Sequence, residues 1–377
     1  MIYRNYGKRS GEKISALGFG CMRLPETEKD GKWSIDEEQT IPLLRRAKEL
    51  GVNYFDTGLY YCHQNSEAAV GKAVKPFREE ILLSTKCPMG LVSKTKDYRA
   101  QLERSLKTMG SDYIDFYHFW SLDRTAFDSK VMKLGLIDEA LKLKEEGLIR
   151  HISFSFHDDA EVIRHIIDTG KVFETMLVQY NLLDRANEEM IAYAASQGLG
   201  VCIMGPVGGG RLAAPTGLAG RILGESGKTW PTYELALRFV LGNPNVSCAL
   251  SGMGSLEQLE QNAKIASDET PLTEAEWKQI GDSLEQIRKF SGLYCTGCAY
   301  CQPCPAGIDI PKIFSCYTMH NVYELSKLAK EEWNNYMRKV GLTLAHCKNC
   351  GICERKCPQH IKVREELGRV EGVLARL

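Results

Sequence analysis

Over its first 290 residues the chain alternates short apolar runs with longer stretches in which apolar side chains recur at helical spacing. Short apolar runs between turn residues indicate buried strands, and recurrence every three or four positions indicates amphipathic helices. The expected strands cover residues 16–20, 54–56, 81–84, 114–118, 149–154, 176–179, 200–204 and 246–250. The expected helices include residues 36–50, 98–109, 133–146, 159–168, 187–197, 233–241 and 256–266.

Strands that alternate with helices at this spacing predict parallel β-α units. Eight such units in about 260 residues match the size of a (β/α)8 TIM barrel, so we expect an α/β protein whose residues 1–290 form that barrel. Residues 1–14 predict a β-hairpin in front of it. The Gly/Pro-rich stretch 205–232 is too long for a simple connection, so we expect it to grip a cofactor or act as a lid.

Residues 291–377 differ in kind, because eight of the fourteen cysteines lie there in two tight runs that each end in Cys-Pro. Three cysteines spaced by two residues can hold three corners of one [4Fe–4S] cluster, and in two-cluster ferredoxins the cysteine before proline ligates the other cluster. The first run has one residue fewer before its last cysteine than the usual pattern. The expected ligands are Cys295, Cys298, Cys301 and Cys357 for one cluster, and Cys347, Cys350, Cys353 and Cys304 for the other.

Structural zinc and a disulfide framework are the alternatives for these cysteines. Zinc sites usually pair two C-x2-C units and do not place four cysteines in each run, while disulfide frameworks suit short secreted chains. The spacing therefore favours two iron–sulfur clusters. Helical patterns at 312–320 and 322–337 predict that residues 291–377 form a small, mostly α-helical ferredoxin-like domain.

Composition narrows the class of protein. The formal net charge is zero and there is no basic block, so we expect neither nucleic acid nor a membrane surface as a partner. No apolar run reaches the roughly 18 residues of a transmembrane helix, and the N-terminus lacks the apolar core of a signal peptide. Oxygen-sensitive clusters and six further cysteines fit a reducing cytosol, so we expect a cytoplasmic protein.

Two segments, Tyr54 to Tyr61 and Leu83 to Lys86, carry the strongest catalytic signal. Each lies at the carboxyl end of an expected strand, where barrel enzymes place their chemistry. In these residues the chain resembles the aldo-keto reductases, a family with Asp and Tyr five residues apart after the second strand, Lys after the third and His after the fourth. The resemblance extends over residues 1–290 through Asn65-Ser66-Glu67, Gly71, Gln179-Tyr180-Asn181, Ser251-Gly252-Met253 and Leu259-Glu260-Gln261-Asn262. With its cysteine tail, the chain is similar to the members of that family that are fused to a ferredoxin domain.

The resemblance implies a catalytic role for three of these residues. Tyr61 would be the general acid that protonates a carbonyl oxygen as hydride arrives, although Tyr60 is an adjacent competitor. A free tyrosine has a pKa near 10, and we expect the cation of Lys86 to lower it. Asp56 would pair with Lys86 and keep it charged and oriented.

The fourth strand departs from the family. Trp120 occupies the position of the family's histidine, and His118 lies two residues earlier on the same strand face. The two positions are about 6.6 Å apart along a strand, so His118 either acts at the site after a shift of the strand or packs deeper in the barrel. We expect Trp120 to form a wall of the substrate pocket, because its indole is neither an acid nor a base at working pH.

The resemblance also implies the cofactor site. Ser155 and Gln179 match positions that bind the nicotinamide carboxamide, and Met204 stands where many members have a stacking tyrosine. The segment Ser251, Gly252 and Met253 would bind phosphate at the N-terminus of the helix that follows. Gln258 and Asn262 match positions on the adenine side of the cofactor. NADP(H) is the usual cofactor of the family, but no Arg or Lys in 251–262 marks a 2′-phosphate, so NAD(H) stays open.

The sequence thus predicts an oxidoreductase that transfers hydride between a nicotinamide cofactor and a small-molecule carbonyl or alcohol. Hydride carries two electrons and one cluster takes one, so the clusters would be structural, would serve a redox partner protein, or would imply a second cofactor such as a flavin. The alternative is an electron-transfer or redox-sensing protein whose barrel has lost ordinary reductase turnover. The presence of Trp120 at the position of the family's histidine favours this alternative.

Overall fold

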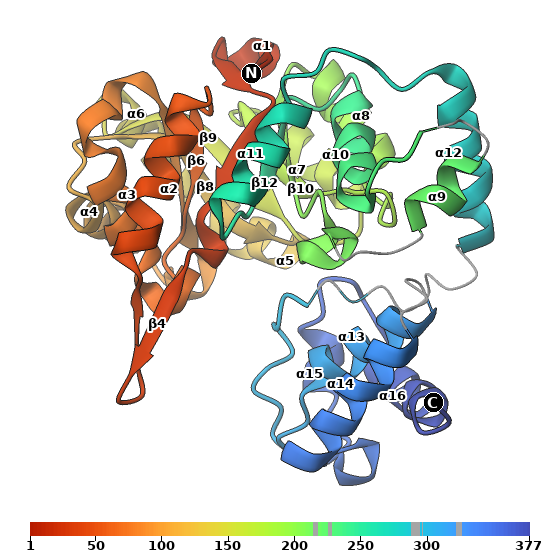
Figure 1. The fold of residues 1–377 in the computed structure, drawn as a ribbon. Coiled ribbons are helices and arrows are strands. Elements are labelled where there is room, and N and C mark those ends of the chain that lie inside the picture. Colours follow the sequence, from red (N-terminus) through yellow and green to blue (C-terminus); the bar gives the residue numbers. More distant parts are fainter. Residues whose placement is uncertain (214–217, 225–227, 288–294, 296, 322–325) are drawn as a thin grey trace. The chain divides into compact units, whose positions relative to one another are not determined.

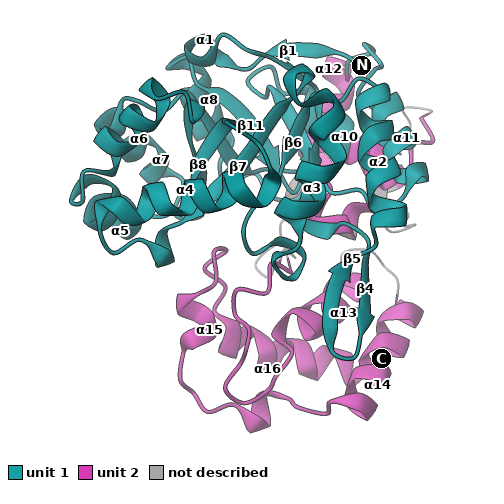
Figure 2. Cartoon of the chain, turned by 90° about the vertical axis from the view of Figure 1, so that its left-hand side faces the viewer, with its two compact units in different colours: residues 1–206, 237–271 teal, residues 207–236, 272–377 magenta. Residues whose placement is uncertain are grey.

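The structure of the 377-residue chain is a computed structural model that describes all residues except 214–217, 225–227, 288–294, 296 and 322–325 (Figure 1). The chain divides into two compact units, which are described one at a time (Figure 2). The first comprises Met1–Pro206 and Leu237–Pro271, and the second comprises Val207–Ala236 and Leu272–Leu377. The domain boundary that the sequence predicts, at residue 290, lies outside the described residues.

The first unit is built on a closed barrel of eight parallel strands. Neighbouring strands follow the chain order, and pairing of the last strand with the first closes the barrel. The strands are β3 (Leu17–Gly20), β6 (Tyr54–Asp56), β7 (Leu82–Pro88), β8 (Ile114–Leu122), β9 (Ile149–Phe156), β10 (Thr175–Gln179), β11 (Gly200–Met204) and β12 (Cys248–Ser251). The expected (β/α)8 barrel is therefore confirmed.

Strands β7 and β8 run further at their carboxyl ends than the apolar pattern indicates. Their pairing continues to Pro88 opposite Trp120, beyond the polar residues at which the expected strands stop. Lys86 and Trp120 consequently lie on paired strands rather than on loops. Their backbone positions are thus fixed by the barrel.

Helices flank the barrel strands, as the alternating pattern predicts (Figure 1). In α4, Tyr98, Leu102 and Leu106 are buried on one face, and Gly110 ends the helix in the left-handed conformation at φ 60°. Helix α3 lies outside the expected helices, and its Gly71 permits close packing, since a Cβ there would lie 2.1 Å from the Met109 carbonyl oxygen. The flanking helices are α2 (Glu37–Glu49), α3 (Ser66–Val74), α4 (Thr95–Met109), α6 (Leu136–Glu145), α7 (Glu161–Gly170), α8 (Glu188–Ser196), α10 (Thr232–Gly242) and α11 (Leu256–Ile265).

Two antiparallel hairpins accompany the barrel. The expected N-terminal hairpin consists of β1 (Tyr3–Asn5) and β2 (Lys13–Ser15), joined through the short helix α1 (Gly7–Ser10). A second hairpin, β4 (Glu26–Lys29) and β5 (Lys32–Ile35), follows the first barrel strand and was not expected. Its side chains are mostly polar and exposed, so no apolar alternation marks its strands.

The described part of the second unit is helical. Residues 205–232, expected as a long loop, contain η6 (Gly208–Ala213) and α9 (Leu218–Leu223). The expected helical patterns of the tail correspond to α13 and α14, with 322–325 outside the described residues. Buried residues of α13, α14 and α16 form one apolar core, among them Ile313, Phe314, Trp333, Leu367 and Val370. The helices are α12 (Glu274–Ile287), α13 (Ile310–Asn321), α14 (Ser326–Lys339), η9 (Leu344–His346), α15 (Ile352–Arg355) and α16 (Val363–Leu374).

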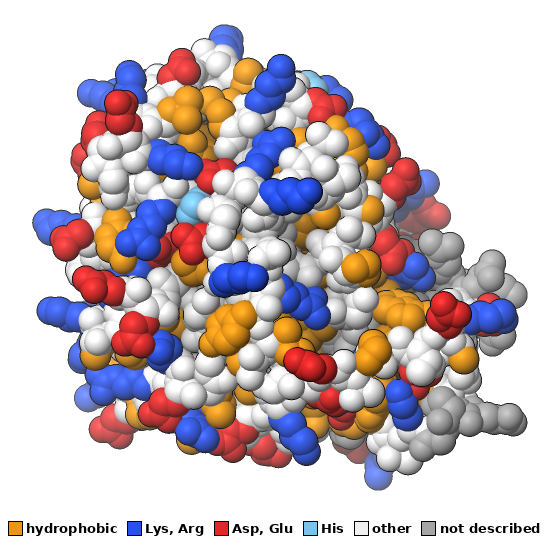
Figure 3. All heavy atoms as spheres, turned by 90° about the horizontal axis from the view of Figure 1, so that it is seen from above, with side chains coloured by type: hydrophobic (Ala, Val, Ile, Leu, Met, Phe, Trp, Pro, Cys, Tyr) orange, Lys and Arg blue, Asp and Glu red, His pale blue; other side chains and the backbone are white. Residues whose placement is uncertain are grey.

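The charge distribution follows the neutral composition. The face drawn in Figure 3 carries interspersed basic and acidic side chains among its described residues, without a field of one sign. None of the helices that the structure describes is both long and apolar enough to cross a membrane.

Candidate active site

Asp56 and Lys86 form a buried ion pair inside the barrel. Asp56 ends β6 opposite Ser84 of β7, and Lys86 follows two residues later on the same face of that strand. The Lys86 Nζ lies 2.6 Å from Asp56 Oδ2 and donates to the Thr57 carbonyl at 2.7 Å, while the Ser84 hydroxyl donates to Asp56 Oδ1 at 2.5 Å. Both charged side chains are 1% exposed. A buried pair is tolerated when such additional hydrogen bonds complete it.

Tyr61 lies beside this pair. It begins η2 (Tyr61–Gln64), and its backbone N–H donates to the Gly58 carbonyl at 3.0 Å. The Lys86 Nζ lies over the Tyr61 ring, 4.7 Å from its centroid. Tyr60 is 51% exposed and contacts Trp120. The structure therefore brings together Asp56, Lys86 and Tyr61, as the sequence predicts.

The expected effect of Lys86 on the Tyr61 hydroxyl is not found. Removal from water raises the pKa of Tyr61 well above its usual value, and the nearby Asp56 carboxylate raises the pKa further. The ammonium of Lys86 points to Asp56 and lies over the face of the ring, so the carboxylate opposes its influence. Tyr61 is consequently held protonated at neutral pH before a substrate binds.

Trp120, not His118, is the residue of β8 that contacts Tyr61. The two rings meet edge to face with centroids 5.5 Å apart, and a Cβ on Gly58 would lie 3.1 Å from the indole. His118 is fully buried, with Nε2 3.4 Å from the Tyr54 hydroxyl. Burial, reinforced by the charge of Lys86, lowers the pKa of His118 to about 3. The histidine is thus neutral at working pH.

The nicotinamide-side residues lie at the ends of β9, β10 and β11. The Ser155 hydroxyl accepts a hydrogen bond from the Ser121 backbone N–H at 2.7 Å. Gln179 of β10 and Met204 of the neighbouring strand β11 lie side by side in the parallel pairing of the two strands. The Gln179 Nε2 is buried and has no partner within the described part of the chain. An unsatisfied buried amide donor is costly, and the carbonyl of a carboxamide would satisfy it, so these residues fit a nicotinamide ring.

The phosphate-side residues lead from β12 into α11. Ser255 caps the helix and accepts from the Gln258 N–H at 3.3 Å, while Gln258 Oε1 accepts from the Gly254 N–H at 2.9 Å. Asn262 donates from Nδ2 to the Ser251 hydroxyl at 3.2 Å. Between these residues lie Gly252 and the buried Met253. The arrangement fits a phosphate, because backbone N–H groups and the helix dipole favour an anion there.

Several residues that support the site received no role from the sequence. Ser84 holds the second oxygen of Asp56, and its position two residues before Lys86 on the same strand was the available signal. Ser66 donates to the Cys21 carbonyl at 2.7 Å, and Glu67 accepts from Thr85 at 2.7 Å. The resemblance named Ser66 and Glu67 as motif residues, and these contacts fix the backbone after β3 and the strand β7 next to the buried Asp56–Lys86 pair.

The eight tail cysteines of the second unit line two pockets of similar size. Each cysteine lies at a position that the structure describes and is free of disulfide bonds. One pocket, of about 340 Å³, is lined by Cys295, Cys298, Cys301 and Cys357. The other, of about 390 Å³, is lined by Cys301, Cys304, Cys347, Cys350 and Cys353.

The pockets divide the cysteines as the spacing does, with Cys301 shared between the two linings. Burial and the neighbouring Cys295 raise the pKa of Cys301 to about 12, so four ionised thiols around one pocket are unfavourable without a cation. Four soft sulfur donors around one space suit an iron–sulfur cluster or zinc. The donor set therefore fits the clusters that the spacing predicts.

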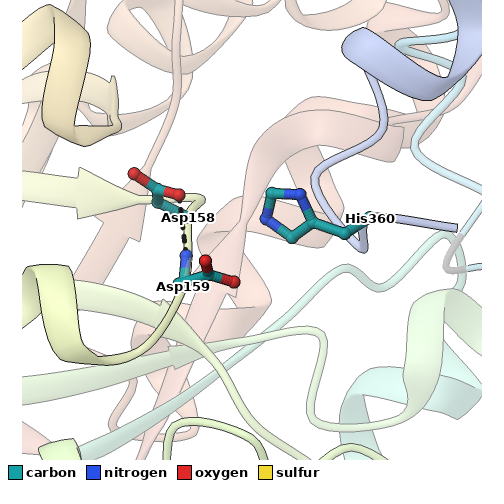
Figure 4. A group of neighbouring side chains, drawn as sticks. All are labelled: Asp158, Asp159 and His360. Carbon is teal, nitrogen blue, oxygen red and sulfur yellow. Dashed lines mark hydrogen bonds between the residues drawn. The ribbon is translucent and has the colours of Figure 1, made fainter.

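Two acidic residues follow β9 in the first unit. The Asp158 carboxylate accepts from the backbone N–H of Asp159 and from that of Arg124, each at 2.8 Å (Figure 4). His360, drawn in the same view, belongs to the second unit, and we assign no metal site to the three residues.

A closed eight-stranded barrel that carries a tyrosine beside a buried Lys–Asp pair defines a class of nicotinamide-dependent oxidoreductases. The model of the aldo/keto reductase family matches residues 16–285, and the chain belongs to this family. It is an NAD(P)-dependent oxidoreductase, and its family implies a small-molecule carbonyl substrate.

The matches with relatives of known sequence or structure span most of each relative's length. The chain is 27% identical over 297 residues to the L-galactose dehydrogenase of Arabidopsis thaliana, covering 71% of this chain and 91% of the relative. It is 29% identical over 267 residues to an uncharacterized oxidoreductase of Schizosaccharomyces pombe, covering 67% and 82%. The holo form of the aldo-keto reductase AKR11C1 from Bacillus halodurans superposes with a TM-score of 0.64 at 28% identity, covering 75% and 96%.

Proposed function

We propose that the chain exchanges hydride between NADP(H) or NAD(H) and a carbonyl or alcohol carbon, with Tyr61 as the proton donor and two [4Fe–4S] clusters in the tail. The contact between Tyr61 and the buried Lys86–Asp56 pair carries this proposal. The relative from Arabidopsis is named as a dehydrogenase of a sugar, so aldoses and sugar lactols belong among the first substrates to test.

Each residue of the site has a defined part in the reaction. The Tyr61 hydroxyl donates its proton to the carbonyl oxygen, and the resulting tyrosinate is stabilised by the ammonium of Lys86 beside the ring. Asp56 fixes the position of the Lys86 ammonium through the buried ion pair at 2.6 Å. A bound nicotinamide supplies or accepts the hydride. Trp120 shapes the pocket, and Gln179 and Ser155 orient the carboxamide.

The pockets of the second unit would hold one cluster each, with Cys295, Cys298, Cys301 and Cys357 on the first and Cys304, Cys347, Cys350 and Cys353 on the second. Such clusters supply one-electron transfer when bound. Hydride moves two electrons together, so in this proposal the clusters support the tail or serve a redox partner protein.

A second candidate is a protein that senses redox state or carries electrons and has lost ordinary reductase turnover. Trp120 favours it, because the indole replaces the family's polar histidine beside Tyr61. Oxidation of NADH and NADPH by the purified holoprotein over a panel of carbonyls separates the two candidates. Turnover of at least one carbonyl supports the reductase, and its absence across the panel with both coenzymes supports the alternative.

Substitutions on β8 test the role of Trp120. Trp120→His is expected to maintain or raise kcat for simple carbonyls and to change the substrate range, because it restores a polar group beside Tyr61. Trp120→Ala should act mainly on KM, since a pocket wall contributes to substrate binding. Steady-state kinetics of these variants and of His118→Ala on one substrate decide the matter. A large loss of kcat confined to His118→Ala would place His118 in the catalytic set instead.

The buried His118 predicts a dependence of stability on pH. Its pKa is lowered to about 3 in the folded protein, whereas an unfolded chain binds the proton near pH 6.5. The folded state thus binds fewer protons, and stability is lost as pH falls from about 6.5 towards 3. At about 1.4 kcal/mol per pH unit, this histidine contributes a loss of about 2 kcal/mol by pH 5.

Urea unfolding at pH 7 and pH 5 measures this contribution. His118→Gln retains a hydrogen-bonding side chain near Tyr54 but does not titrate, so its free energy of unfolding should fall less between the two pH values. Other groups, including the tail, contribute equally to both proteins and cancel in the difference. The same loss in wild type and variant would show that His118 is not held neutral.

A further inference from the structure

The segment that follows Tyr61 has a strained backbone. Cys62, His63 and Gln64 have φ values of 49°, 51° and 71°, so three consecutive residues other than glycine occupy the left-handed region. Such residues persist only where the surroundings hold them, and they gather at functional sites. Because Tyr61 directly precedes this segment, we expect its ring position to depend on what holds the strained residues.

The turn that follows β3 holds the side chain of Cys62. The Cys62 thiol donates to the Cys21 and Met22 carbonyls at 3.6 and 3.5 Å, and the Asn65 N–H donates to the Cys62 carbonyl at 2.9 Å. The side chain of His63 instead contacts the hairpin of β4 and β5.

The β4–β5 hairpin contacts the imidazole of His63 through one aromatic stack and one hydrogen bond. The indole of Trp33 stacks on the imidazole with centroids 4.7 Å apart and planes 10° from parallel. The His63 Nδ1 donates to Glu26 Oε1 at 2.8 Å, and the Asn65 side-chain amide donates to the Trp33 carbonyl at 3.1 Å. The contacts thus come from both strands, since Glu26 lies on β4 and Trp33 on β5.

The hairpin itself has little else to hold it. Nearly all of its side chains are exposed, and Trp33 keeps 43% of its surface in water. An isolated two-stranded hairpin is marginally stable. A large aromatic residue on such an exposed strand is explained by its stack on His63, which stabilises the hairpin and the strained segment together.

We propose that the β4–β5 hairpin positions Tyr61 for proton transfer by holding His63 in its strained conformation, with Trp33 and Glu26 as positioning residues. The inference rests on the proposed role of Tyr61 and adds to it. Neither Trp33 nor Glu26 touches the reacting atoms. Losing the stack lets the segment relax, and the Tyr61 ring moves away from its place against the Lys86 ammonium.

Kinetics of hairpin variants test this proposal on the holoprotein with its best carbonyl substrate. Trp33→Ala is expected to lower kcat about ten- to a hundred-fold, because small displacements of a catalytic group have effects of this size. The coenzyme Kd should stay within about two-fold, and the deuterium isotope effect on kcat should rise as chemistry becomes slower. Trp33→Phe, which keeps a stacking ring, should restore most of the rate. Lys32→Ala at the tip of the hairpin is the matched control and should leave kcat unchanged.

A double-mutant cycle separates positioning from general damage. In a Tyr61→Phe background, Trp33→Ala should have almost no further effect on kcat, because there is no proton donor left to position. An equal loss in both backgrounds, or no loss in the single variant, would overturn the proposal. Glu26→Gln gives a second test through the other contact. Wild-type rates in Tyr61→Phe alone would instead contradict the proposed function, so the two failures are distinguishable.

Discussion

Replacement of Tyr61 by phenylalanine is expected to lower kcat for carbonyl reduction about 10²–10⁴-fold, the usual contribution of a general acid. The ring, its edge-to-face contact with Trp120 and its contact with Lys86 all remain. Only the proton donor is lost, so the coenzyme Kd should be nearly unchanged. Steady-state rates and a fluorescence titration with NADPH or NADH measure the two effects separately.

Tyr60→Phe is the matched control for this experiment. Tyr60 is adjacent in sequence, half exposed and also in contact with Trp120. Loss of the Tyr60 hydroxyl should change kcat by no more than about two-fold, because this hydroxyl is not the proton donor in the proposed reaction. A large loss in Tyr60→Phe with wild-type rates in Tyr61→Phe would reverse the assignment of the acid.

Removal of cysteines from one pocket is expected to remove half of the iron. Two clusters with four thiolates each predict about eight iron and eight sulfide per chain. The double variant Cys295→Ser/Cys298→Ser takes two donors from the first pocket, so about four iron and four sulfide should remain in the second. Anaerobic purification followed by iron, sulfide and zinc analysis provides the measurement.

Cys316→Ser is the control, because Cys316 is buried in the same unit but lines neither pocket. It should retain about eight iron per chain. Zinc without iron in the wild type would contradict the cluster assignment. A complete loss of iron in the double variant would show that the two sites do not form independently.

The barrel was predictable because its mostly buried strands leave short, largely apolar runs at regular intervals along the chain. The β4–β5 hairpin was not, because Glu28, Lys29 and Lys32 are exposed and no apolar alternation marks the two strands. The ends of β7 and β8 were also missed, since Lys86 and Trp120 continue strands whose apolar signal has already stopped.

The sequence predicted which residues form the site, because they match the motifs of a known family. It did not predict the pKa of Tyr61, which depends on burial and on neighbouring charges. The resemblance to the aldo-keto reductases implied one site for Asp56, Tyr61 and Lys86, and the structure brings these three residues together. The direction of the Tyr61 pKa was predicted wrongly, because burial and the Asp56 charge raise this pKa, and the spacing of the residues reveals neither effect. The strained segment after Tyr61 was invisible for a similar reason, because its left-handed residues carry no glycine to mark them.

The most direct test of hydride transfer to a carbonyl carbon follows the label from a coenzyme deuterated at the transferred position. The holoprotein, with its iron content measured, is given this coenzyme and the carbonyl with the highest turnover. The account predicts one deuterium on the former carbonyl carbon for each coenzyme oxidised, as mass spectrometry of the product alcohol would show. Coenzyme oxidation that reduces the clusters and leaves no deuterium in the product would contradict it.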